Sequence, residues 1–132
     1  MQEENHKKKA IQTSKAPEAI GPYSQAVSQG PWVFCSGQIP IDMGVGKLLE
    51  ADISKQTELV LNNLKAVLEE AGADLDSVVS TRIYLTDFAD FKTVNLVYGE
   101  FFKAPYPARA TVGVKELPLG AKIEIEAIAF AK

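Results

Sequence analysis

The apolar residues of this chain switch between two spacings, and that switching constrains the fold more than any other feature. A repeat of two is typical of β-strands and a repeat near 3.6 of α-helices. An apolar stripe of helical period runs from Asp52, a predicted N-cap, to a stop at Gly72, and "TDFADFKTVNLVYGEFF" predicts a second helix. We predict strands in "YSQAVSQGPWVFCSGQIP" (two, broken at 29–31), "SVVSTRIYL", "RATVGV" and "KIEIEAIAF". The order β-β-α-β-α-β-β indicates an α+β domain with both helices on one face of the sheet.

The last predicted strand has two unlike faces. One face carries only small or branched apolar side chains, Ile123, Ile125, Ala127 and Ala129, which suits a core beneath helices. The other mixes charged with large apolar side chains, Lys122, Glu124, Glu126, Ile128 and Phe130. That second face is too apolar to be freely solvated, so we expect a second copy of the chain to cover it. A cleft at such an interface would place Glu124 or Glu126 near polar groups of the neighbour.

Two rare residue types narrow the chemistry. The single histidine, His6, lies in the polar stretch "MQEENHKKK", so Ser-His-Asp, Cys-His and histidine-ligated zinc sites are not expected. The single cysteine, Cys35, leaves no internal disulfide and suits a reducing cytoplasm. We expect residues 1–9 to be a mobile polar tail and residues 10–132 to be a single domain. Catalysis would then depend on carboxylates, tyrosine, lysine, Cys35 or water.

Charge and hydropathy disfavour two classes of partner. The formal net charge is −3, whereas a nucleic-acid-binding face needs a basic patch. No apolar run approaches the roughly 18 residues that a membrane span requires. We therefore expect a cytoplasmic protein that binds neither nucleic acid nor membrane, and no candidate metal site is apparent.

Arg109, in "PARATVGV", has two interpretations. It could be an edge residue or pair with one of the two glutamates, as most strand arginines do. Alternatively, its guanidinium could grip a small carboxylate through two parallel hydrogen bonds. By alternation Thr111 and Gly113 share its face, and Gly113 would leave the backbone open to a small ligand.

Other candidates also have two interpretations each. Glu124 and Glu126 share a strand face. They could be an ordinary pair of solvated carboxylates, or one of them could be desolvated enough to act as an acid/base. Their spacing does not distinguish between these two interpretations. Tyr23 follows a Gly-Pro turn and could either cover the core or line a ligand site. Asn95 is a mediocre helix former in the second helix, which hints at a side-chain hydrogen bond.

Several stretches together resemble one family. "APEAIGPYSQAV", "SGQIP", "DFADFKTVNLVYGEFF", "PARATV" and "KIEIEAIA" are similar, in that order, to signatures of the RidA (formerly YjgF) reactive-intermediate deaminases. The similarity runs from about residue 16 to residue 129. It implies a chorismate-mutase-like sheet of about six strands with two helices on one face. It also implies a homotrimer with its sites at subunit interfaces.

The resemblance further implies a cofactor-free enzyme. Its substrates would be 2-imino acids, in equilibrium with 2-enamino acids, which pyridoxal-phosphate dehydratases release from serine or threonine. The products would be 2-keto acids and ammonia, as for a 2-iminobutanoate/2-iminopropanoate deaminase. The enzyme would thus serve metabolite damage control.

Site residues carry over by position. Arg109 falls on the carboxylate-binding arginine, and Glu124 falls on the residue that handles the attacking water. Tyr23, Ser36 and Asn95 fall on positions that line or support the pocket. Thr111 stands where many deaminases of the family have cysteine. That departure keeps a second hypothesis open, a non-catalytic trimer that binds small carboxylates as a metabolic regulator. A nuclease, the third hypothesis, fits poorly with the acidic body and the absence of a folded histidine.

Overall fold

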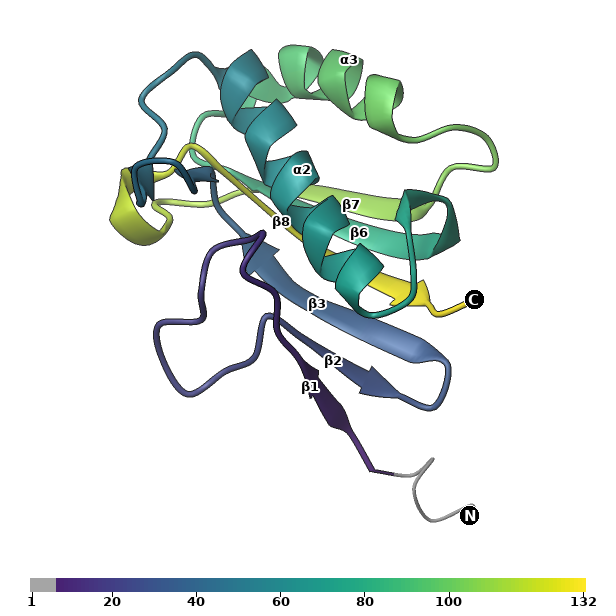
Figure 1. Ribbon diagram of the computed structural model, residues 1–132. Coiled ribbons are helices and arrows are strands. Elements are labelled where there is room, and N and C mark those ends of the chain that lie inside the picture. The colour runs from purple at the N-terminus through teal and green to yellow at the C-terminus, as the bar shows by residue number, and fades with distance from the viewer. Residues whose placement is uncertain (1–6) are drawn as a thin grey trace.

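A six-stranded sheet is the centre of the fold, with its strands in the order β1-β2-β3-β8-β6-β7 (Figure 1). The computed structural model describes residues 7–132. The strands are β1 (Lys9–Ile11), β2 (Ala26–Gln29), β3 (Trp32–Gln38), β6 (Val78–Leu85), β7 (Ala108–Gly113) and β8 (Ile123–Phe130). Neighbouring strands are antiparallel except for β6 and β7, which run parallel. A parallel pair needs a crossover connection, and a helix provides it here.

Two helices, α2 (Ile53–Glu70) and α3 (Phe91–Phe101), lie on the same face of this sheet (Figure 1). The Asp52 side chain accepts a hydrogen bond from the backbone N–H of Lys55 at 2.9 Å, as expected of an N-cap. Gly72 follows α2 with a φ of 80°, a left-handed conformation that glycine adopts without strain. The predicted N-cap, the helix stop and the α+β class are therefore confirmed.

The core lies between the helices and the sheet. In β8 the four residues of the predicted inner face are buried: Ile123, Ile125, Ala127 and Ala129. They pack against α2, whose fully buried side chains are Thr57, Val60, Leu61, Leu64, Val67 and Leu68. From α3, Val94, Val97 and Tyr98 complete the layer. The alternation in the sequence thus identified the inner face of β8 correctly.

The opposite face of the sheet has no helix over it, and we call it the open face. Large aromatic side chains stand there, with Trp32 45% exposed, Phe34 46% and Phe130 42%. Trp32 and Phe130 pair across β3 and β8 with ring centroids 6.3 Å apart, in an edge-on arrangement. Val112 from β7 adds a further exposed apolar side chain. A contiguous apolar surface of this kind is uncommon on a protein that works as a monomer.

The N-terminal region differs in part from the sequence-based prediction. Residues 1–6 of the expected mobile tail lie outside the described residues, whereas Lys9 already belongs to β1. β1 pairs with β2, so the sheet begins within the segment assigned to the tail. A three-residue strand has too few positions to display an alternating pattern, so β1 was not predicted.

The remaining elements are short. A hairpin joins β4 (Ile41–Asp42) to β5 (Lys47–Leu48) through a turn that contains Gly44 and Gly46. Single turns of 3-10 helix form η1 (Leu75–Ser77), η2 (Phe88–Asp90) and η3 (Pro118–Gly120). Within η3, Leu119 has a φ of 59°, a conformation that a branched residue rarely adopts.

Candidate functional site

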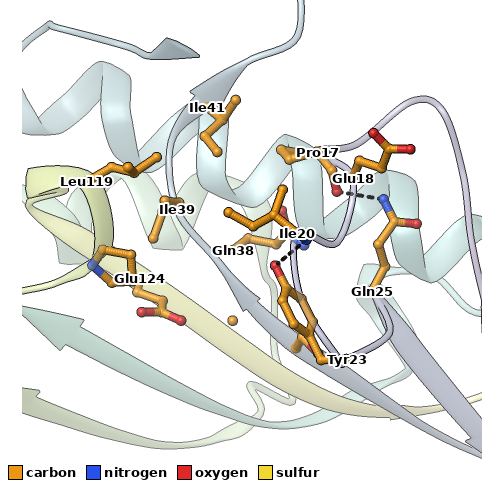
Figure 2. Close-up of a pocket in the computed structure, with 13 residues that line it drawn as sticks. Pro17, Glu18, Ile20, Tyr23, Gln25, Gln38, Ile39, Ile41, Leu119 and Glu124 are labelled. Atoms are coloured by element: carbon orange, nitrogen blue, oxygen red, sulfur yellow. Dashed lines mark hydrogen bonds between the residues drawn. The ribbon is translucent and has the colours of Figure 1, made fainter. Parts of the chain in front are cut away.

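A cavity of about 470 Å³ opens at one end of β3 and β8 (Figure 2). Its walls come from three segments that are distant in sequence: the loop before β2, the end of β3 with the residues that follow, and η3. The lining is mainly apolar: Pro17, Ile20, Ile39, Ile41, Pro118 and Leu119. Glu124 is the acidic group that β8 contributes to it. An apolar cavity with a few polar groups is the usual form of a small-molecule site.

Glu124 extends across Gly37, which has no side chain to obstruct it. A Cβ atom at position 37 would lie 2.7 Å from Cδ of Glu124 and would also collide with its carboxylate. The backbone is irregular here, since Cys35 pairs with Ala127 and Gln38 with Ile125, so that two β3 residues face one β8 residue. Such a bulge redirects side chains and is frequent beside active sites. Here the bulge and the glycine together give Glu124 its place in the cavity.

The two candidate glutamates differ in environment. The Tyr84 hydroxyl donates a hydrogen bond to Oε1 of Glu126, and this bond is the main cause of a raised Tyr84 pKa. Glu124 has no such partner among the residues described. Burial raises the Glu124 pKa, and the negative charge of Glu126 raises it further. Glu124 is therefore the carboxylate whose proton affinity suits acid–base work, a choice that spacing alone did not settle.

Tyr23 and Ser36 line the cavity from two neighbouring segments, the loop before β2 and the end of β3. The hydroxyl oxygen of Tyr23, a half-exposed residue, accepts a bond from the N–H of Ile20 at 3.4 Å (Figure 2). The Ser36 hydroxyl donates to the Ser24 carbonyl at 2.6 Å, so it ties the wall to the turn before β2. Both residues therefore line the cavity, and Ser36 also supports it.

Gln25 supports this wall and was not singled out from the sequence. Its buried side chain accepts a hydrogen bond from the N–H of Thr13 at 2.7 Å and donates to the Pro17 carbonyl at 2.7 Å. It also donates to the carbonyls of Thr13 and Ala16. One amide thus holds the whole loop that borders the cavity. Its position immediately after "GPYS" contained no signal beyond a polar residue at the start of a strand.

Arg109 lies on the other side of the sheet, beside α3. Its guanidinium carbon is 4.9 Å from the ring centre of Tyr98 and 5.8 Å from that of Phe91. No salt bridge to Arg109 exists within residues 7–132. The ion pair with a glutamate that the sequence left open is therefore not formed inside the chain. A second, shallower cavity of about 350 Å³ contains Arg109, and its other lining residues are Asn95, Tyr98, Gly99, Tyr106 and Pro107.

Two buried oxygen atoms on this side lack hydrogen-bond partners in the described part of the chain. They are Oδ1 of Asn95 and Oγ1 of Thr111. Thr111 follows Arg109 by two residues on the same strand face, as the alternation predicted. Buried polar atoms without partners are rare in folded proteins, and a bound ligand or water commonly satisfies them. The hydrogen bond suggested for the Asn95 side chain is not made by Oδ1 here.

The predicted site residues therefore form two groups. Tyr23, Ser36 and Glu124 line the first cavity, and Asn95 and Arg109 line the second, with Thr111 on the strand face of Arg109. Cys35 belongs to neither group. Its thiol is buried, and burial raises its pKa to about 12, which keeps it protonated.

Residues 7–132 lack two kinds of feature. No three histidine, cysteine, aspartate or glutamate side chains come close enough together to hold a metal ion. No helix in this range has the length and hydropathy needed to cross a bilayer.

Comparison with known proteins identifies the family. The model of the family described as Endoribonuclease L-PSP matches residues 13–131. The chain belongs to this family, also called RidA or YjgF. The match covers all the elements that build both cavities. It confirms the resemblance seen in the sequence motifs.

Relatives within the RidA family have informative names. The human 2-iminobutanoate/2-iminopropanoate deaminase is 44% identical over 123 residues, covering 93% of this chain and 90% of that protein. Reactive Intermediate Deaminase A of Arabidopsis thaliana chloroplasts is 51% identical, covering 93% of this chain and 66% of that protein. Among solved structures, TdcF of E. coli with bound serine has a TM-score of 0.89 at 44% identity, covering 94% of this chain and 99% of that one.

Proposed function

We propose that this protein is a cofactor-free deaminase that hydrolyses 2-imino acids to 2-keto acids and ammonia. The substrates, in equilibrium with 2-enamino acids, would come from pyridoxal-phosphate enzymes that dehydrate serine or threonine. Arg109 binds the substrate carboxylate, and Glu124 accepts a proton from the attacking water. Tyr23, Ser36, Asn95 and Thr111 line or support the site.

One observation carries the proposal: the arginine has no acidic partner within the described chain. A guanidinium that is not engaged by a protein carboxylate keeps its donor fork for a ligand carboxylate. Burial meanwhile gives Glu124 the raised proton affinity of a general base. A substrate with a carboxylate beside an electrophilic carbon matches these two groups. The names of the human and Arabidopsis relatives agree with this chemistry.

The same proposal requires more than one subunit. Arg109 and Glu124 point away from opposite faces of the sheet, so a site that uses both takes each from a different chain. The exposed aromatic residues of the open face supply an apolar surface through which copies could associate. We propose a homotrimer with one site at each of its three interfaces. There the Arg109 cavity of one subunit faces the Glu124 cavity of the next.

The chemistry needs neither a metal nor a nucleophilic side chain. A protonated imine is electrophilic at C2, and Arg109 fixes its carboxylate so that C2 lies beside a water molecule. Water attacks C2 while Glu124 takes one of its protons, giving a carbinolamine. Glu124 then returns this proton to nitrogen. The C–N bond breaks, and the hydroxyl proton leaves with ammonia as ammonium. Positioned acid–base catalysis of this type contributes roughly 10²–10⁴-fold.

A coupled assay tests the proposal. A threonine dehydratase generates 2-iminobutanoate, semicarbazide competes for the imine, and 2-ketobutyrate formation is followed with and without this protein. We expect the protein to accelerate keto-acid release and to divert imine from semicarbazide. Arg109→Ala should abolish the effect. Acceleration that survives in Arg109→Ala would exclude the role assigned to this arginine.

The same assay distinguishes a deaminase from the alternative, a non-catalytic trimer that binds small carboxylates as a metabolic regulator. Thr111 replaces the cysteine found in many deaminases of the family, and its Oγ1 is buried without a partner, ready for a ligand. If 2-ketobutyrate binds while imine hydrolysis is not accelerated, the protein is a carboxylate-binding regulator. RNA cleavage that persists in Arg109→Ala would instead favour a nuclease.

A further inference from the structure

Aromatic rings, instead of acidic groups, hold Arg109. The nearer ring is Tyr98, 4.9 Å from the guanidinium carbon, and Phe91 is at 5.8 Å. Both distances fall within the roughly 6 Å over which a cation is attracted to a ring face. A carboxylate partner would occupy the same N–H donors that a ligand carboxylate needs. A ring face attracts the cation and leaves those donors free.

The Tyr98 ring is itself fixed from two sides. Its hydroxyl forms a buried hydrogen bond of 2.7 Å with Oγ1 of Thr81, and its ring lies 4.4 Å from that of Phe102. The residue is only 4% exposed. The hydrogen bond holds the hydroxyl in place, and rotation of the ring about its Cβ–Cγ axis would disturb the contact with Phe102. The ring face under Arg109 is therefore rigid.

The pairing of β6 with β7 also places Thr81 beside Arg109. Thr81 of β6 lies directly opposite Arg109 of β7, in the parallel pair that carries both residues. The residue that anchors the Tyr98 hydroxyl is therefore the backbone neighbour of the arginine that the ring supports. Thr81, Tyr98 and Arg109 are therefore mutual neighbours across two strands and α3.

We propose that Tyr98 is a positioning residue for Arg109. Its ring attracts the guanidinium and holds it at the cavity that also contains Asn95. Tyr98 then improves carboxylate binding without touching the substrate. The inference rests on the proposed function, because it gives Arg109 a carboxylate to bind. It adds a residue whose contribution is electrostatic and comes from its ring face.

Fluorinated phenylalanines at position 98 test the attraction between the ring face and the Arg109 guanidinium, because they leave the shape of the side chain nearly unchanged. Each added fluorine weakens the negative potential of the ring face, so the series from phenylalanine to its mono-, di- and trifluoro forms grades the cation–ring attraction. The measurements are the dissociation constant of 2-oxobutanoate and the separate KM and kcat of imine hydrolysis. We expect the dissociation constant and KM to rise stepwise, by about 2- to 30-fold over the series, with kcat nearly constant.

Two further variants separate positioning from folding. Tyr98→Phe removes the bond to Thr81 but keeps the ring, so it is the reference for the series. Phe102→Leu removes an equally buried ring that packs against Tyr98, whereas within residues 7–132 the rings beside Arg109 are those of Phe91 and Tyr98. We expect Phe102→Leu to lower the melting temperature but to weaken 2-oxobutanoate binding much less than the trifluoro variant does, because the Tyr98 ring face remains beside Arg109.

The outcomes differ for the two proposals. Wild-type protein that hydrolyses the imine but shows a flat fluorination series would overturn the role of Tyr98 and leave the deaminase proposal intact. Loss of affinity in Phe102→Leu as large as in the trifluoro variant would also overturn it, since packing alone would then explain the effect. Wild-type protein that neither binds 2-oxobutanoate nor accelerates hydrolysis would overturn both proposals.

Discussion

Arg109 and Glu124 lie on opposite faces of the same sheet. Arg109 pairs in register with buried Thr81 and faces the rings of α3. Glu124 pairs with Tyr84 on the open face and extends over Gly37. No side-chain rotation brings groups on opposite faces of a sheet together. A reaction that uses both residues at one substrate molecule therefore needs at least two chains.

The loop beside the first cavity should depend on one amide. Gln25→Ala removes four hydrogen bonds to residues 13–17 and leaves buried backbone groups of that loop unpaired. We expect a loss of about 3 kcal/mol in the free energy of unfolding, measured by urea denaturation. Gln12→Ala, at an exposed position of the same region, is the control and should have little effect. Equal stability of the two variants would contradict this role.

Gly37 should matter for catalysis more than for stability. In Gly37→Ala the new methyl group would occupy the space of the Glu124 side chain, which is flexible and can move away. We therefore expect a nearly unchanged melting temperature and a fall in kcat of about 10²-fold or more, because the general base is displaced. Gly44→Ala, in the turn between β4 and β5 and outside both cavities, is the control, since a Cβ there would meet only the Asp42 side chain, at 3.1 Å. Full activity in Gly37→Ala would show that the position of Glu124 is unimportant.

The pH dependence of hydrolysis should report the environment of Glu124. Burial first, and then the charge of Glu126, hold the Glu124 pKa above its ordinary value of 4.5. Because the carboxylate is the active form, kcat/KM should rise with pH through this raised pKa. Glu126→Gln removes the second cause only, so the acid limb should move to lower pH without reaching 4.5. Glu69→Gln, on the exposed side of α2, is the control and should leave the acid limb of the pH profile unchanged. An acid limb that does not move in Glu126→Gln would show that the charge of Glu126 does not raise the Glu124 pKa.

Lysine should not replace Arg109. It keeps the positive charge but lacks both the planar fork for a carboxylate and the flat surface that lies over Tyr98. We expect Arg109→Lys to raise the KM for 2-iminobutanoate by about tenfold or more, with unchanged stability because the side chain is exposed. Arg82→Lys, which changes the chain's other arginine, should retain the wild-type KM. A wild-type KM in Arg109→Lys would mean that charge alone suffices.

Much of the fold could be predicted because each long element repeats its pattern. The inner face of β8, the stripe of α2 and the caps at Asp52 and Gly72 were all identified from spacing. β1 could not be predicted because three residues are too few to show a repeat of two. The bulge in β3 could not be predicted because it depends on pairing with β8, which the local sequence does not encode.

The candidate site was predictable in its residues but not in its arrangement. Alternation placed Glu124 and Glu126 on the face of β8 away from the helices and put Arg109 and Thr111 together on one face of their strand, but it did not say which face of the sheet Arg109 and Thr111 occupy. That depends on the order of β6, β7 and β8 in the sheet. The hydrogen bond from Tyr84 to Glu126 links residues 42 apart, so only the structure distinguishes the two glutamates.

Mixed oligomers test most directly whether one site draws on two subunits. Arg109→Ala and Glu124→Gln subunits carrying different tags are co-expressed, and hybrids are isolated by tandem affinity purification. Each parent should be inactive. In each mixed trimer, one of the three interfaces would combine an intact Arg109 with an intact Glu124, so about a third of wild-type activity should return. Verified hybrids that stay as inactive as their parents would contradict a site shared between subunits.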